Sequence, residues 1–349
     1  MVLDAPDETR KDSGAVGFET AALDTWLGEI LAAKVRGDPA TIEAHLWEVG
    51  EVTYLPKSRT TLRVHYVKKD ANGNVRVAPL VQMLAMKVID YCIPRSRIEK
   101  ARELDARFGS TDATLALANE ARNLFADVRL SGEGGELLLY FLIENVLKVP
   151  QILCKMPLKT SSNMHYHGVD GVHAKVVDAK TLAVYWGESK LYATPLEGIR
   201  ACLDSITPFV LDDGTGASER DRLLVRDNVD INDPEAEAVI KRFFDLRTKE
   251  STRLECRAAC LVGFSQKDYP HPFETSDGPA VTADVLSTMK DWATKVATGV
   301  KGRSLTEVEI EFFCLPFPDV SEFRTSIAKQ LGIPFDEADV TDGGDNGED

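Results

Sequence analysis

Two neighbouring stretches of the sequence decide the fold: GEGGELLLYFLIENVL at residues 132–147 and GVDGVHAKVVDAKTLAVYWGESK at residues 168–190. The first begins with glycines and continues as a long apolar run, which predicts an amphipathic helix. The second contains apolar runs at residues 170–178 and 182–188 on either side of a short polar turn. This pattern predicts two antiparallel strands that follow the helix.

The register of the two strands decides which side chains meet. Facing residues in an antiparallel pair lie on one side of the sheet. If Asp178 pairs with Leu182, Asp170 faces Lys190, and Glu188 lies on the same side. This register gathers two carboxylates and one ammonium group at one end of the hairpin.

A tighter turn gives a different register. If Asp178 pairs with Thr181, Asp170 comes to lie beside Ser189 on the other face of the sheet. The acids then meet only through a bulge or a kink, which the glycines beside them allow. Both registers remain open from the sequence.

The acids and the lysine suit phosphodiester chemistry. Asp170 and Glu188 repel each other at close range unless a cation lies between them, and oxygen ligands favour Mg²⁺ or Mn²⁺. Such an ion can activate a water molecule, and Lys190 can orient that water or stabilise the transition state. Glu136 on the preceding helix is a further candidate ligand, with Glu133 in reserve one helical turn away.

A glutamate on a helix, followed by strands that carry an aspartate and a (D/E)xK tripeptide, is similar to the core of the PD-(D/E)xK nuclease superfamily. On this resemblance Glu136 matches the helix acid, Asp170 the aspartate, and Glu188 and Lys190 the tripeptide. Val169 stands where the superfamily name has proline, at a position that varies among its members. The resemblance implies a Mg²⁺-dependent deoxyribonuclease with these four residues as its catalytic set.

Residues 130–200 resemble more closely the HamA family, the nuclease subunits of the Hachiman anti-phage system. That resemblance implies a DNA-cleaving effector controlled by a superfamily 2 helicase partner of the HamB kind. Neither composition nor periodicity indicates a helicase. The alternative is a catalytically silent, nuclease-like module that docks and regulates a nucleic-acid-processing partner.

Charge is unevenly distributed along the 349 residues, whose net charge is −15. Acidity on this scale disfavours unspecific binding to nucleic acid. The segment from Lys57 to Arg107 nevertheless has twelve Lys and Arg against five Asp and Glu. A basic segment can contact phosphates. Its weak candidates for DNA contact are Lys57, Arg59, Arg63, Lys68 and Lys69.

We expect an α/β fold with a restriction-endonuclease-like core, in which helices flank a central mixed sheet. The N-terminus lacks a signal-peptide core and no apolar run is long enough to span a bilayer, which predicts a cytoplasmic protein with no membrane contact. The expected divisions are a disordered lead-in at 1–16, a mixed and mostly helical region with a hairpin at 17–125, the nuclease domain at 126–335, and a disordered acidic tail at 336–349.

Further elements follow from periodicity and from helix start signals. Helices are expected at residues 18–35, 39–49, 79–93, 95–108, 111–125, 195–206, 233–248, 282–298 and 320–331, and strands at residues 151–156, 254–264 and 307–315. Two further strands, at residues 61–67 and 75–78, are expected to form the N-terminal hairpin, with its turn at DANGN.

Overall fold

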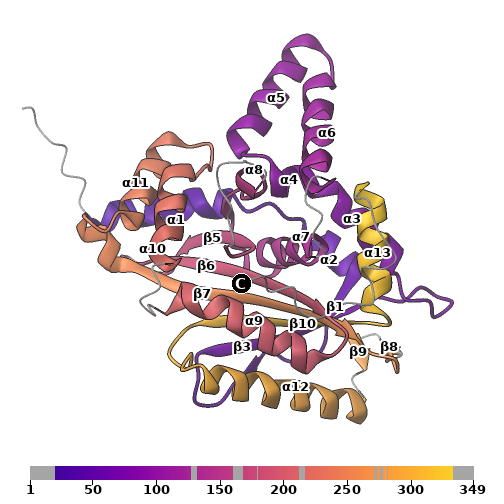
Figure 1. The fold of residues 1–349 in the computed structure, drawn as a ribbon. Coiled ribbons are helices and arrows are strands. Elements are labelled where there is room, and N and C mark those ends of the chain that lie inside the picture. The colour runs from indigo at the N-terminus through magenta and orange to yellow at the C-terminus, as the bar shows by residue number, and fades with distance from the viewer. Residues whose placement is uncertain are drawn as a thin grey trace, which may run out of the picture.

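The chain folds around one mixed sheet with helices on both faces (Figure 1). The computed structural model describes residues 20–126, 132–159, 168–178, 180–211, 217–270, 273–275, 278–280 and 282–332. The strands follow the order β1-β3-β10-β7-β6-β5-β4, and β2 also pairs with β3. The strands of this sheet are β1 (Leu46–Glu48), β2 (Thr53–Tyr54), β3 (Thr60–Val67), β4 (Gln151–Leu153), β5 (Gly171–Val176), β6 (Leu182–Tyr192), β7 (Leu254–Ser265) and β10 (Ile310–Phe317).

The centre of the sheet is parallel and its edges are antiparallel. β10 lies parallel to both β3 and β7, and β7 lies parallel to β6. β5 runs antiparallel to β6 and β4, and β1 runs antiparallel to β3. Two short strands, β8 (Phe273–Thr275) and β9 (Gly278–Ala280), pair only with each other among the described residues. The expected α/β class with a mixed sheet is confirmed.

Two hydrophobic cores lie on opposite faces of the sheet, because successive strand residues point to opposite sides. In β6, Val184 and Trp186 enter one core, whereas Ala183 and Tyr185 enter the other. The first core is covered by α1 (Thr20–Ala33), α9 (Pro195–Val210), α10 (Ala217–Asn228), α11 (Pro234–Phe244) and α12 (Ala283–Gly302). The second is covered by α3 (Val77–Met86), α4 (Val88–Cys92), α7 (Glu133–Leu142) and α13 (Val320–Leu331).

The remaining helices lie around these layers. α5 (Arg95–Phe108) and α6 (Asp112–Ala126) form a hairpin that projects away from the sheet (Figure 1). A π-helical turn, η1 (Ile143–Leu147), continues α7. The short elements are α2 (Pro39–His45), α8 (Met156–Lys159) and the 3₁₀ turn η2 (Lys249–Arg253). None of the described helices has the length and apolarity needed to cross a membrane.

Asp-Pro pairs start two helices as expected. Asp38 caps α2 by accepting a hydrogen bond from the Ala40 N–H, and Asp233 caps α11 in the same way. Pro then occupies the first helical position, where its missing N–H is not needed. The helix expected at residues 39–49 is shorter than predicted, because the chain at Leu46 pairs with β3 and becomes β1.

The hairpin expected over residues 61–78 forms only at its turn, where the Arg76 N–H donates to the Lys68 carbonyl oxygen at 2.8 Å. β3 forms, but its partners are β1, β2 and β10, and the returning chain makes one isolated bridge between Lys69 and Val75. The chain then enters α3 at Val77, whose apolar face is buried in the second core. Burial of that face outweighs the strand preference of the short apolar run.

The N-terminal region shares the sheet with the rest of the chain. Its strands β1 and β3 extend the sheet beyond β10, so the division expected near residue 125 does not separate two sheets. The expected lead-in at residues 1–16 and the acidic tail at residues 336–349 lie outside the described residues.

Candidate active site

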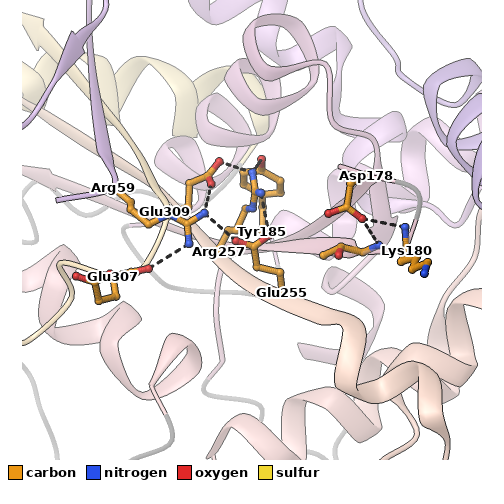
Figure 2. A network of polar contacts seen from close by, with 9 residues as sticks. Arg59, Asp178, Lys180, Tyr185, Glu255, Arg257, Glu307 and Glu309 are labelled. Atoms are coloured by element: carbon orange, nitrogen blue, oxygen red, sulfur yellow. Dashed lines mark hydrogen bonds and ion pairs between the residues drawn. The ribbon is translucent and has the colours of Figure 1, made fainter.

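The hairpin of β5 and β6 has a register that neither sequence-based alternative predicted. Val176 pairs with Leu182, and the pairing continues to Gly171 opposite Gly187. The turn is longer than expected, because the Asp178 carboxylate accepts hydrogen bonds from the backbone N–H groups of residues 180 and 181 at 2.8 and 2.9 Å (Figure 2). Both proposed pairings of Asp178 are therefore wrong.

The register differs from the first prediction by two residues, so it keeps the same faces. Asp170 precedes β5 at the level of Glu188 rather than Lys190. Glu188 and Lys190 still lie on one face of β6, next to α9, where the Cys202 thiol donates to the Glu188 carbonyl oxygen at 3.4 Å. Glu188 and Lys190 therefore meet as expected, whereas Asp170 lies beside them and turns its carboxylate to Ser189.

Asp170 directly precedes β5. The pairing of β5 with β6 ends at Gly171 opposite Gly187, whereas β6 extends to Tyr192. The N–H of Asp170 donates to the Gly187 carbonyl oxygen at 2.7 Å. Its carboxylate Oδ2 accepts from the Ser189 N–H at 2.8 Å and from Ser189 Oγ at 2.7 Å. The Asp170 carboxylate thus accepts the Ser189 N–H, which would otherwise bond to a carbonyl oxygen of a neighbouring strand. β5 does not pair with β6 from Glu188 onward, so groups from both faces of the sheet can reach this open edge of β6.

Glu188 and Lys190 form an ion pair at this edge. Lys190 Nζ lies 2.9 Å from Glu188 Oε1, and the two side chains are 29% and 7% exposed. Burial raises the pKa of Glu188, the charges of Lys190 and Lys155 oppose that rise, and the charge of Glu136 adds to it. Burial lowers the pKa of Lys190, but the charge and hydrogen bond of Glu188 and the charge of Asp170 outweigh it, so that pKa is raised.

Glu136 reaches the same place from α7, on the opposite face. A Cβ atom at Gly135 would lie 3.1 Å from Ser189 Oγ, and one at Gly134 would lie 2.6 Å from a methyl carbon of Ile327. The two glycines therefore allow the first turn of α7 to approach β6 and α13 closely. Glu136 Oε2 accepts a hydrogen bond from the Tyr91 hydroxyl at 2.7 Å.

The four predicted residues thus come together from three parts of the chain. Asp170 and Glu188 lie level on neighbouring segments, Lys190 pairs with Glu188, and the charge of Glu136 acts on Glu188. Glu133 begins α7, and its side chain lies outside the described residues.

Two residues near the acids were missed by sequence reasoning. Tyr91 belongs to α4, 45 residues before Glu136, and no local pattern connects the two. Lys155 follows β4, is 2% exposed, and lowers the pKa of Glu188 through its charge. The only sequence signal for Lys155 is that a lysine follows an apolar strand. β4 and β6 both run antiparallel to β5, so their C-terminal ends point the same way and Lys155 lies at the end of the sheet that carries Glu188.

The acids are engaged by protein donors in this structure. Among the described residues, no three acidic, histidine or cysteine side chains surround one point that could hold a metal ion. The donor chemistry nevertheless suits Mg²⁺ or Mn²⁺, because all three acids offer carboxylate oxygens. The pKa of Glu188 is raised mainly by burial and further by the charge of Glu136, and a bound cation would favour the ionised form of both acids.

Arg59, one of the DNA-contact candidates, belongs to an ion-pair network that ties strands together (Figure 2). Its guanidinium lies 3.1 Å from Glu255 and 2.8 Å from Glu309. Arg257 pairs with the same two carboxylates and donates to the Tyr185 hydroxyl at 2.9 Å. The network joins the beginnings of β3, β7 and β10, so the ion pairs of Arg59 stabilise the sheet.

The other cationic candidates are spread along β3 and its flanks. Arg63 pairs with Glu48 and Glu311 at 3.0 and 3.2 Å. Lys68 lies over the ring of Trp47 and Lys69 over that of Tyr269. Lys57 occupies a turn with φ of +60°. β3 is separated from β6 by β10 and β7, so these side chains start three strands away from the acids.

Comparison with known proteins gives one clear relationship. A search of curated proteins found no match. The sequence matches the family model described as HamA over residues 43–331, which includes every residue of the acid site and most of the chain. The chain therefore belongs to the HamA family.

Proposed function

We propose that this protein is the nuclease effector of an anti-phage defence complex, a metal-dependent hydrolase of DNA phosphodiesters. Membership of the HamA family supports a role in anti-phage defence. The observation that carries the chemical proposal is the meeting of Glu136, Asp170, Glu188 and Lys190 at the open edge of β6. Carboxylate oxygens can hold a divalent cation, and an ammonium group can stabilise the charge that develops on a phosphate.

Asp170, Glu188 and Glu136 would hold the divalent cation. The ion would supply charge neutralisation at the phosphate and lower the pKa of a water molecule. Asp170 is oriented for this role by its two hydrogen bonds to Ser189, which fix one carboxylate oxygen at 2.8 and 2.7 Å from its donors. An acid held by such outer partners loses less freedom when it binds an ion.

Lys190 has two tasks in this proposal. Its ammonium group compensates the buried charge of Glu188 at 2.9 Å. With a cation bound to Glu188, Lys190 would be available to donate to a phosphate oxygen or to the attacking water. The raised pKa of Lys190 keeps the ammonium group protonated while it pairs with Glu188.

A partner that brings the DNA fits the charge of the protein. The chain has a net charge of −15, and Arg59 and Arg63 are each engaged by two carboxylates. Sequence-independent DNA binding relies on cations available for phosphates. We propose that a helicase of the HamB kind supplies this contact and controls cleavage, as the family resemblance implies.

A second candidate function is a catalytically silent module that regulates a nucleic-acid-processing partner. The engagement of each acid by a protein donor, with no cluster of three metal-binding side chains among the described residues, favours it. Cleavage of DNA by the purified complex separates the two functions, because a silent module gives no cleavage attributable to this chain.

The test compares variants in plasmid cleavage with the co-purified complex. Glu188→Gln and Lys190→Met should each abolish cleavage that depends on Mg²⁺ or Mn²⁺, and EDTA should abolish that of the wild type. Glu250→Gln is the matched control. Glu250 lies in η2 before β7, its side chain is 7% exposed like that of Glu188, and it pairs with Arg242 at 2.6 Å. Wild-type cleavage by either site variant contradicts the proposal.

A further inference from the structure

Tyr91 connects the N-terminal region to two of the site acids. It lies on α4, is 2% exposed, and its hydroxyl donates to Glu136 Oε2 at 2.7 Å. The carbonyl oxygen of Asp170 lies 3.1 Å from the same hydroxyl. One hydroxyl thus contacts a side chain from α7 and the backbone just before β5.

The Tyr91 hydroxyl has one proton, so its two contacts are the branches of one bifurcated hydrogen bond. A charged acceptor makes the stronger and shorter branch, so the proton points mainly to the Glu136 carboxylate. The longer branch reaches the carbonyl oxygen of Asp170, whose N–H binds the Gly187 carbonyl oxygen at 2.7 Å. We infer that Tyr91 is a positioning residue of the acid site, which directs the Glu136 carboxylate.

Tyr91 is itself held firmly enough for this role. Its ring centroid lies 5.4 Å from that of Tyr140, and its carbonyl oxygen accepts from Gln151 Nε2 at 3.3 Å. These contacts fix the ring, and a tyrosine hydroxyl carries the proton that it donates.

The position of Tyr91 in the chain gives this contact a further meaning. α4 leads directly into the projecting hairpin of α5 and α6, and α7 with Glu136 follows that hairpin (Figure 1). The hydrogen bond from Tyr91 to Glu136 therefore joins the two segments from which the hairpin emerges. The N-terminal region completes the acid site rather than only packing against it.

The experiment removes the hydroxyl and keeps the ring. Tyr91→Phe should leave the fold intact and remove this hydrogen bond from the Glu136 carboxylate, seen as a changed side-chain direction in a crystal structure of the variant. Loss of a residue that holds a metal ligand by a hydrogen bond typically lowers metal affinity by about 10- to 100-fold. The affinity for Mn²⁺, measured by electron paramagnetic resonance, should therefore fall by about 10- to 100-fold. The metal readout rests on the proposed function, whereas the crystal structure does not.

Two variants separate positioning from general damage. Tyr140→Phe is the matched control, because Tyr140 is 3% exposed, adjoins Tyr91 and lies one turn after Glu136 on α7. It should bind Mn²⁺ as the wild type does. In a Glu136→Gln background, Tyr91→Phe should change Mn²⁺ affinity much less than it does alone, because the two residues act as one unit.

Each outcome decides a separate point. An unmoved Glu136 carboxylate in the Tyr91→Phe crystal overturns the inference, and so does an equal loss of affinity in both backgrounds. A wild-type protein that binds no Mn²⁺ contradicts the proposed function instead, and the direction of the Glu136 carboxylate then decides the inference alone.

Discussion

Glu144 offers the sharpest test of the electrostatics inside the fold. It lies in the π-helical turn that continues α7 and is 0% exposed. Its carboxylate accepts from the Gln151 N–H at 2.8 Å and from the Arg36 N–H at 2.5 Å, and an Arg95 nitrogen lies 3.7 Å away. The acid therefore joins the helix that carries Glu136 to β4 and to the N-terminal region.

Burial raises the pKa of Glu144 from 4.5 to about 7, although its hydrogen bonds and the two arginines oppose the rise. A carboxyl group with a higher pKa in the folded state binds its proton more tightly when folded. Its contribution to stability is then full below the unfolded pKa and is lost as pH rises through the folded pKa. The shift corresponds to a loss of about 3 kcal/mol in the free energy of unfolding between the two pKa values.

Glu144→Gln tests this value by urea unfolding at several pH values from about 4.5 to 8. Gln does not titrate and keeps an acceptor oxygen for one of the two backbone donors; loss of the other hydrogen bond lowers its stability equally at every pH. The free energy of unfolding of the wild type should fall relative to the variant by about 3 kcal/mol up to pH 7 and then stay level. The contributions of other titrating groups are the same in both proteins and cancel in the difference between them. If the free energy of unfolding has the same pH dependence in the wild type and the variant, the reasoning is refuted.

Three further substitutions test the site and its surroundings. Lys155→Met removes a charge that lowers the pKa of Glu188, so the acidic limb of a pH–rate profile for cleavage should move to higher pH, and an unmoved limb would contradict this role. Gly135→Ala places a Cβ atom 3.1 Å from Ser189 Oγ and should reduce the cleavage rate by about tenfold or more through displacement of α7, which single-turnover kinetics would measure. Arg59→Gln breaks two partly exposed ion pairs and should lower the free energy of unfolding by about 1 kcal/mol while leaving DNA affinity of the complex unchanged; a weaker affinity in a binding titration would restore Arg59 as a DNA contact.

Much of the architecture could be predicted because local signals agreed with the tertiary structure. The Asp-Pro pairs at residues 38–39 and 233–234 mark helix starts that the structure confirms. The apolar runs that became β6, β7 and β10 are buried strands at nearly the expected positions. Prediction failed at residues 75–78, where packing against the second core decided between strand and helix.

The candidate site could be predicted only in part, for a related reason. The face shared by Glu188 and Lys190 follows from strand alternation, and it survived an error of two residues in the register because two is the period of a strand. The contacts of Tyr91 and Lys155 with the acids depend on packing between segments distant in sequence. No periodicity or local motif records such contacts.

A crystal of the protein soaked in Mn²⁺, with anomalous scattering measured near the manganese edge, tests the metal site most directly. We expect an anomalous peak bound by carboxylate oxygens of Asp170 and Glu188, with Glu136 as a direct or water-linked ligand and Lys190 turned away from Glu188. A peak elsewhere, or none while Lys190 keeps its 2.9 Å contact with Glu188, would contradict a divalent-cation site formed by these acids.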